Sequence, residues 1–145
     1  MNKYPFWWDK TVTIYNKIED GSGRVSWQPA TLTGCFWRYV NNVTYVNNVR
    51  MEVKQVICRV PKKDNYLSLE DWLSTAEKTG YFTLRNGDIV ILGEVSDEVD
   101  EYTKGKHSTD LLKKYNDVNR AFRIETFVDD TGDGLCAEHY HLKGI

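Results

Sequence analysis

The sequence has no excess of charge of either sign. Its 19 Lys and Arg are balanced by 21 Asp and Glu, so the formal net charge is -2. A protein whose main task is to bind nucleic acid carries a clear basic excess, because it must neutralise phosphates. The balance therefore argues against that class, although it is compatible with transient contact with DNA.

Cysteine is scarce, and long apolar runs are missing. The three cysteines, Cys35, Cys58 and Cys136, are odd in number and irregular in spacing, which argues against a disulfide framework and indicates reduced thiols in a cytoplasm. No run is long enough to span a membrane, and residues 1–10 lack the apolar stretch of a signal peptide. We therefore expect a soluble protein with no membrane partner. A length of 145 residues predicts a single domain over residues 1–145.

Aromatic residues, by contrast, are plentiful. They make up 13% of the chain and include five Trp and nine Tyr, and a domain of this size can fully bury a limited number of large rings. The cluster Phe6-Trp7-Trp8 stands beside the first expected strand, and Trp37 lies in a second aromatic patch. These side chains suit two roles: packing at the end of the fold, or anchoring in a partner subunit, where Trp is enriched.

Short segments rich in β-branched and aromatic residues, separated by turns, dominate the sequence. The expected strands are residues 11–18, 24–27, 31–39, 43–46, 49–60, 89–92, 121–128 and 135–142. The Asn pairs at 41–42 and 47–48 predict two turns, and a change of apolar phase between Val53 and Val56 predicts a bulge. Pro29 is expected at a strand end or a sheet edge. Residues 89–92 lack polar alternation, so we expect that strand to be covered on both faces.

Two short helices are expected between the strands. The first spans residues 68–78 with Ser68 as its N-cap, and the second spans residues 108–115 with Ser108 or Thr109 as its N-cap. Together with seven to nine strands joined by local connections, they predict a mainly β fold. We expect a small antiparallel β-barrel or sandwich with two short helical insertions and long loops.

An acidic segment follows residues 89–92. Five of the eight residues at positions 94–101 are carboxylates: Glu94, Asp97, Glu98, Asp100 and Glu101. Such a run is typical of a solvated surface loop. The longer segment 93–106 also suits an arm that becomes ordered on assembly, and its carboxylates could contact neighbouring subunits.

Two histidines stand near the C-terminal end. On a strand, His139 and His141 point to the same side, so both rings could reach one metal ion, with Cys136 or Glu138 as further ligands. The alternative is a pair of polar residues on the outer face of an edge strand, or at a subunit interface. Residues 129–134 resemble the start of a calcium loop, but the closing Glu is absent, which favours a hairpin turn.

Patterns typical of catalysis are missing from the sequence. No serine lies in a nucleophile-elbow glycine pattern, and no glycine-rich phosphate loop of either common type is found. We therefore predict a protein that is not an enzyme and that has no catalytic residues, no cofactor and no metal ion.

A family resemblance enters through several segments taken together. Residues 8–16 (WDKTVTIYN), Asp20-Gly21, Trp27 and residues 32–37 (LTGCFW) resemble the opening of small neck proteins of long-tailed bacteriophages. Residues 86–95 (NGDIVILGEV) resemble the polar turn and apolar strand in the middle of those proteins. Residues 122–128 and 139–144 are similar to their last hairpin. The resemblance covers about half of the chain.

The resemblance implies a structural virion protein of the head-closure or stopper type. Such a protein forms a small β-barrel that assembles into a ring, hexameric by the resemblance. The ring lies between the portal or adaptor and the tail terminator or tail tube. There it would retain packaged DNA and dock the tail, in the neck of a virion assembled in the bacterial host cytoplasm.

Other functions stay open at this point. Residues 65–80 and 94–119 look like additions to the simplest neck proteins, which leaves a tail terminator, an adaptor or a tail-tube-like protein as alternatives. A metal-binding module or enzyme that uses His139 and His141 is the alternative from a different class.

Overall fold

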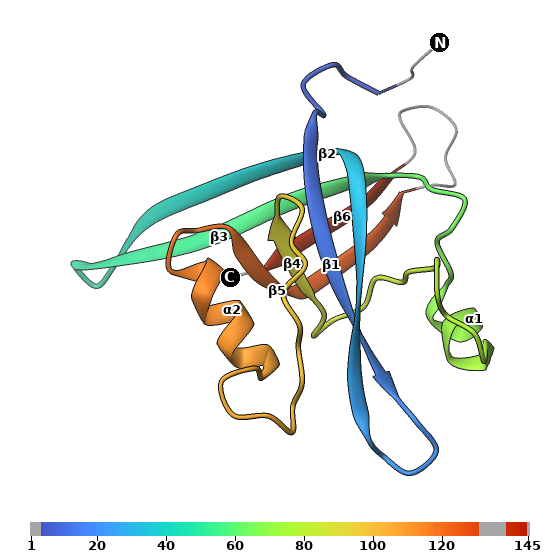
Figure 1. Cartoon of the computed structure of the whole chain (residues 1–145). Helices are drawn as coiled ribbons and strands as arrows, with labels where there is room; N and C mark the ends of the chain where they lie inside the picture. The colour runs from blue at the N-terminus through green and yellow to red at the C-terminus, as the bar shows by residue number, and fades with distance from the viewer. Residues whose placement is uncertain (1–3, 131–138, 145) are drawn as a thin grey trace.

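Six antiparallel strands form a closed ring in the computed structural model, which describes residues 4–130 and 139–144 (Figure 1). In chain order the elements are β1 (Lys10–Glu19), β2 (Val25–Val46), β3 (Val49–Pro61), α1 (Leu69–Ser74), β4 (Ile89–Leu92), α2 (Ser108–Asn116), β5 (Ala121–Asp130) and β6 (His139–Gly144). The strand order around the ring is β1-β2-β3-β6-β5-β4, and β4 pairs back with β1. The predicted mainly β, antiparallel fold with two short helices is confirmed.

The side chains that point into the ring form the main core. Alternate residues of each strand supply it, as the period of two in a strand requires. Its fully buried members include Val12, Ile14, Cys58, Phe122 and Leu142. Burial of this apolar surface is the main force that holds the ring closed.

A second apolar cluster lies outside the ring, between β4 and α2. Ile89 and Ile91 point away from the main core, and Leu111 of α2 and Val95 of the following loop cover them. The prediction that residues 89–92 are covered on both faces is confirmed, because Ile89, Val90 and Ile91 are all fully buried.

The two helices differ from expectation at their ends. Ser68 caps α1 as predicted, with its hydroxyl accepting from the Asp71 N–H, but α1 ends at Ser74, four residues before the predicted end. The Thr75 hydroxyl donates to the Asp71 carbonyl, and the Thr75 backbone is already extended. The cap of α2 is His107, and not Ser108 or Thr109 as predicted.

Fewer strands form than the sequence predicts, because β2 is unbroken. Residues 24–27, 31–39 and 43–46 were expected as three strands, but β2 runs through all but the first residue of them. Pro29 lies within β2, opposite Tyr15 of β1. Pairing with β3 starts at Phe36, so Pro29 is at a sheet edge, where its missing N–H has no ladder bond to make.

β2 changes partner at Gly34 to Phe36. Up to Cys35 it pairs with β1, and from Phe36 onward it pairs with β3. A register shift in the β1–β2 pairing lies at this point, between Lys10 and Val12, and Gly34 has a φ of 72°. A bulge with a glycine in the left-handed region bends a strand sharply, and here it turns β2 away from β1 and onto β3.

Candidate assembly surface

A long hairpin extends beyond the ring. Residues 40–46 of β2 pair with residues 49–55 of β3, whereas β3 begins to pair with β6 at Val56. We call this hairpin, residues 40–55, the arm. Figure 1 shows the arm, in teal and green, reaching well past the other strands.

A single two-residue turn closes the arm. Asn47 and Asn48 have φ angles of 50° and 65°, as the favoured two-residue hairpin turn requires. Asn tolerates this region better than most residues. The turn predicted at residues 41–42 is wrong, because both residues lie in the continuous β2–β3 ladder.

The bulge predicted between Val53 and Val56 is also absent, since the β2–β3 register shows no shift there. Val53 and Val56 point to opposite faces of one regular strand. The apolar phase changes because β3 enters the ring at Val56, which is buried, whereas Val53 is on the arm and 44% exposed.

The two faces of the arm differ in charge. The register places eight residues without charge on the face that continues the outer surface of the ring, and we call it the uncharged face: Val40, Asn42, Thr44, Val46, Val49, Met51, Val53 and Gln55. The opposite face, which we call the charged face, carries the remaining strand residues: Asn41, Val43, Tyr45, Arg50, Glu52 and Lys54. Alternation along a strand produces this division.

Side chains on the charged face satisfy one another. The Asn41 amide donates to the Glu52 carboxylate, and Arg50 approaches the other carboxylate oxygen at 3.4 Å. The hydrogen bond from Asn41 is the main reason that the pKa of Glu52 lies below its usual value. The uncharged face has no such network. Its apolar residues Val46, Val49 and Met51 are 52%, 61% and 48% exposed to solvent.

The N-terminal aromatic cluster divides into an exposed pair and a packed residue. Phe6 and Trp7 are 87% and 55% exposed, and their rings meet edge to face with centroids 5.2 Å apart. Trp8 is buried at the end of the ring, stacked on Tyr4 and edge-on to His139. Trp37 is half-buried, with its ring centroid 5.5 Å from that of Phe122 in the core. The exposed pair is therefore the part of this cluster that is free to meet a partner.

The acidic segment 94–101 is fastened to the fold largely through its own carboxylates. Asp97 accepts hydrogen bonds from Lys114 at 2.7 Å and from the Tyr115 hydroxyl at 3.0 Å. The bond from Lys114 is the main reason that the pKa of Asp97 is lowered. The Tyr15 hydroxyl donates to the backbone carbonyl of Asp97, and burial next to Asp97 raises the pKa of Tyr15 to about 12.

The other carboxylates of the segment act locally, except that Glu94 is simply exposed. Glu98 pairs with Lys106, Asp100 accepts from the Tyr102 N–H and the Thr103 hydroxyl, and Glu101 accepts from the Ser108 N–H at the start of α2. The projecting arm of this protein is thus the β2–β3 hairpin, whereas residues 94–101 are held against α2.

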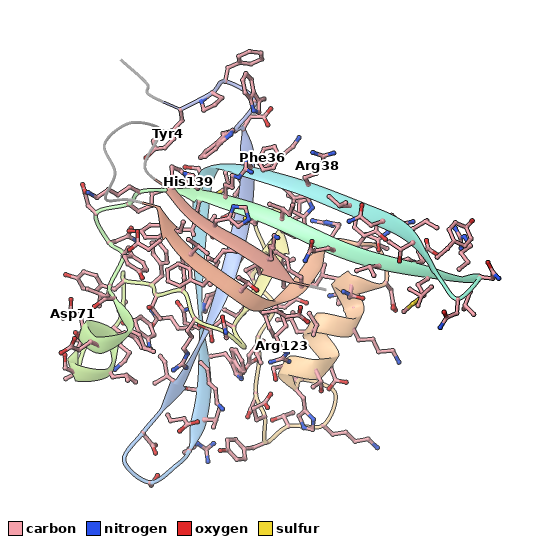
Figure 2. The ribbon with its side chains drawn as sticks, turned by 180° about the vertical axis from the view of Figure 1, so that it is seen from behind. Tyr4, Phe36, Arg38, Asp71, Arg123 and His139 are labelled. Atoms are coloured by element: carbon pink, nitrogen blue, oxygen red, sulfur yellow. The ribbon has the colours of Figure 1, made fainter. Side chains whose placement is uncertain are left out.

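His139 and His141 lie on one side of β6, as the sequence predicts, with ring centroids 6.4 Å apart. The Arg59 guanidinium donates to Nδ1 of His141 at 3.4 Å, and Arg59 also lies over the Phe36 ring. Phe36 and His139 lie at the same end of the ring (Figure 2), where both of their rings are next to Trp8. A cation at this nitrogen opposes metal binding there. Within residues 4–130 and 139–144, no group of three or more His, Cys, Asp or Glu is placed to hold a metal ion. The proposed further ligands, Cys136 and Glu138, and most of the calcium-like segment 129–134 lie outside the described residues.

A polar cluster that the sequence did not reveal closes one end of the ring. Asn16, which interrupts the apolar face of β1, donates to the Asp88 carboxylate at 2.8 Å and to the Thr83 carbonyl at 2.7 Å. All three residues are buried. Burial raises the pKa of Asp88, although Asn16 and Arg85 oppose this shift.

A pocket of about 630 Å³ lies outside this end, beside α1. Its four basic side chains already have partners: Lys17 pairs with Glu19 and Arg85 with Asp88, while Lys78 donates to the Thr75 carbonyl and Arg123 to the Gly87 carbonyl. The thiol of Cys58 is fully buried in the core, and burial raises its pKa far above the usual value, so it is not a reactive thiolate.

In the part of the chain that is described, no helix has the length and apolar character of a membrane span.

The fold and its surface define a small closed antiparallel β protein with a projecting, two-faced arm. The chain belongs to a family of unknown function, DUF6751, whose model matches residues 7–145. No curated protein and no solved structure matches the chain.

Proposed function

We propose that this chain is a structural protein of the neck of a long-tailed bacteriophage. It forms a head-closure ring between the portal or adaptor and the tail, and this ring retains packaged DNA and docks the tail. The observation that carries the proposal is the arm: a closed barrel projects a long hairpin whose outer face has exposed apolar residues and no charge. Such a surface is typical of a subunit that is completed by neighbours.

The sequence resemblance supports the same function from separate residues. Its opening segment, residues 8–16, spans the start of β1, and residues 86–95 span β4. These two strands are hydrogen-bonded to each other. The segments of resemblance therefore belong to the ring itself, whereas α1 and α2 lie in the two stretches that look like additions.

The near-balanced charge of the chain is compatible with a ring around DNA. Copies with a strong net charge would repel one another in a ring, and a strongly basic channel would hold DNA that has to pass. The net charge of -2 keeps the repulsion between copies small and gives the chain no overall basic excess.

Quantitative mass spectrometry of purified virions tests the proposal. In a phage that encodes this chain, we expect about one small ring of copies per particle when the chain is scaled against the portal protein. A copy number equal to that of the tail tube would identify a tube protein instead. Absence of the chain from virions would refute a structural role and return the His139–His141 pair to consideration.

A further inference from the structure

We propose that the uncharged face of the arm docks on the exposed Phe6–Trp7 pair of a second copy of this chain. The inference rests on the proposed function, because it supplies the contact between neighbouring members of a ring. It also stands on features of the single chain, which the following observations give.

The first observation is the chemistry of the uncharged face. Five of its eight residues are apolar, and those near the turn are about half exposed: Val46, Val49, Met51 and Val53. A face without cations offers nothing to a nucleic acid or an acidic peptide, and a face without carboxylates offers nothing to a basic one. The partner that this face fits is therefore an apolar protein surface.

The second observation is the matching surface on the same chain. Phe6 and Trp7 form an aromatic pair whose residues are 87% and 55% exposed. Large rings are the side chains most enriched at the centre of protein interfaces. The flexible thioether of Met51 and the flat, β-branched surface of Val49 and Val53 suit contact with ring faces.

The third observation is that one copy cannot make this contact with itself. The segment that carries Phe6 and Trp7 lies at the end of the ring, whereas the turn of the arm lies far from it (Figure 1). The two surfaces are different patches of one molecule. A patch that binds a different patch on the next copy is a heterologous contact, which generates a closed ring or an open filament.

The size of the contact suits assembly and not a stable dimer. Buried aromatic side chains contribute roughly 150–250 Å² each, so Phe6 and Trp7 supply about half of the roughly 800 Å² per partner of a stable interface. One such contact is weak alone. In a closed ring every copy docks its arm on one neighbour and receives the arm of the other neighbour. Each copy therefore takes part in two contacts, whereas each copy of an isolated pair takes part in one.

Site-directed crosslinking tests the contact in two differently tagged forms of the full chain. One form carries Asp9→Cys beside the aromatic pair, and the other carries Thr44→Cys on the uncharged face, both with Cys136 replaced by Ser. Cys35 and Cys58 are buried and do not interfere. With a short bifunctional maleimide, we expect mixed dimers between the two forms over a concentration series. The matched control, Val43→Cys on the charged face, should give few.

Sedimentation equilibrium provides a second measurement with matched substitutions. Val53 and Val43 are 44% and 42% exposed on opposite faces of the arm. We expect Val53→Lys to weaken self-association at least tenfold and Val43→Lys, which places a cation opposite Glu52, to leave it unchanged. Equal effects of the two substitutions would overturn the proposal.

The outcomes separate this inference from the proposed function. If the main crosslink joins two copies of the Thr44→Cys form, the arms pair with each other and not with the aromatic pair. If mixed dimers are absent both in solution and in virions, the docking contact does not form. Either result overturns the docking proposal even if the chain is found in the neck. Mixed dimers from a chain that is absent from virions would support the docking and refute the neck assignment.

Discussion

At the scale of single residues, the buried cluster of Asn16, Thr83 and Asp88 makes the stability of the protein depend on pH. Asn16 and Asp88 face each other in the interior because β1 and β4 are paired, with Tyr15 opposite Ile89. The sequence shows Asn16 as an interruption of an apolar face but does not name its partner, which lies 72 residues away. Such a pairing depends on the closure of the ring and has no local signal.

Replacing Asp88 by Asn should destabilise the protein by about 1–3 kcal/mol, because three donors converge on a carboxylate and an amide has one acceptor oxygen. The donors are the Asn16 amide, the Lys17 N–H and Arg85. The measurement is the midpoint of urea unfolding. The exposed Glu125→Gln is the control, and an equal loss in both variants would contradict the assignment.

The same carboxyl group predicts a pH dependence with a defined sign. Because the pKa of Asp88 is raised in the folded state, the native protein binds its proton more tightly than the unfolded chain. The stabilisation from this proton is fully present below the ordinary value of 3.8 and is lost as the pH rises through the raised pKa. The difference in the free energy of unfolding between the unsubstituted protein and Asp88→Asn should therefore be largest in acid and become smaller as the pH rises. Urea unfolding at a series of pH values measures this difference.

Gly144 allows β6 to approach β5. A Cβ on Gly144 would clash with the Arg123 carbonyl oxygen and with the Phe122 ring, and the carbonyl is backbone that cannot turn aside. We expect Gly144→Ala to cost about 1–3 kcal/mol through overpacking. Gly21→Ala, where a Cβ meets nothing within 4 Å, is the matched control in a thermal unfolding assay. Equal midpoints would contradict this packing.

At the scale of elements, some features of the arm could be predicted from the sequence and others could not. The turn at Asn47-Asn48 was predictable, since Asn tolerates positive φ, and so was the strand character of its flanks. The length of β2 was not, because its middle passes from a buried ring to a solvated arm and its alternation fades there. In the same way, the five acidic residues at 94–101 predicted a solvated loop, but not that Asp97 would bind Lys114 and Tyr115 of α2.

Shortening the arm should leave the ring intact. Removing residues 41–44 together with their partners 51–54 keeps the register, the turn and the alternation of faces. These residues are exposed, so we expect the melting temperature to change little, while self-association is lost. Differential scanning calorimetry and sedimentation measure the two properties separately. A large fall in melting temperature would show that the arm also stabilises its own barrel.

At the scale of the whole molecule, the class of fold was predictable, whereas the sequence left the choice between a closed barrel and a sandwich open and did not give the strand order. Period-two patterns and turn residues indicate an antiparallel β protein. The return of β4 to β1 and the position of β6 between β3 and β5 join segments far apart in the chain. The exposure of the aromatic residues was not predictable from the sequence: Phe6 and Trp7 are exposed, whereas Trp8 is buried and Trp37 half-buried, and their aromatic character alone does not separate them.

The arm also has a mechanical consequence. Strand β3 continues from the arm into the ring, where it is bonded to β6, whereas β2 bends at Gly34 before it pairs with β1. A pull on the tip therefore runs along the axes of β3 and β6, while the ladder hydrogen bonds between them lie across these axes. Those bonds would be strained side by side in shear instead of being opened one after another. A ring whose subunits are joined by such arms would therefore resist tension strongly. Resistance of this kind would suit the proposed head-closure ring, which has to withstand the pressure of the packaged DNA.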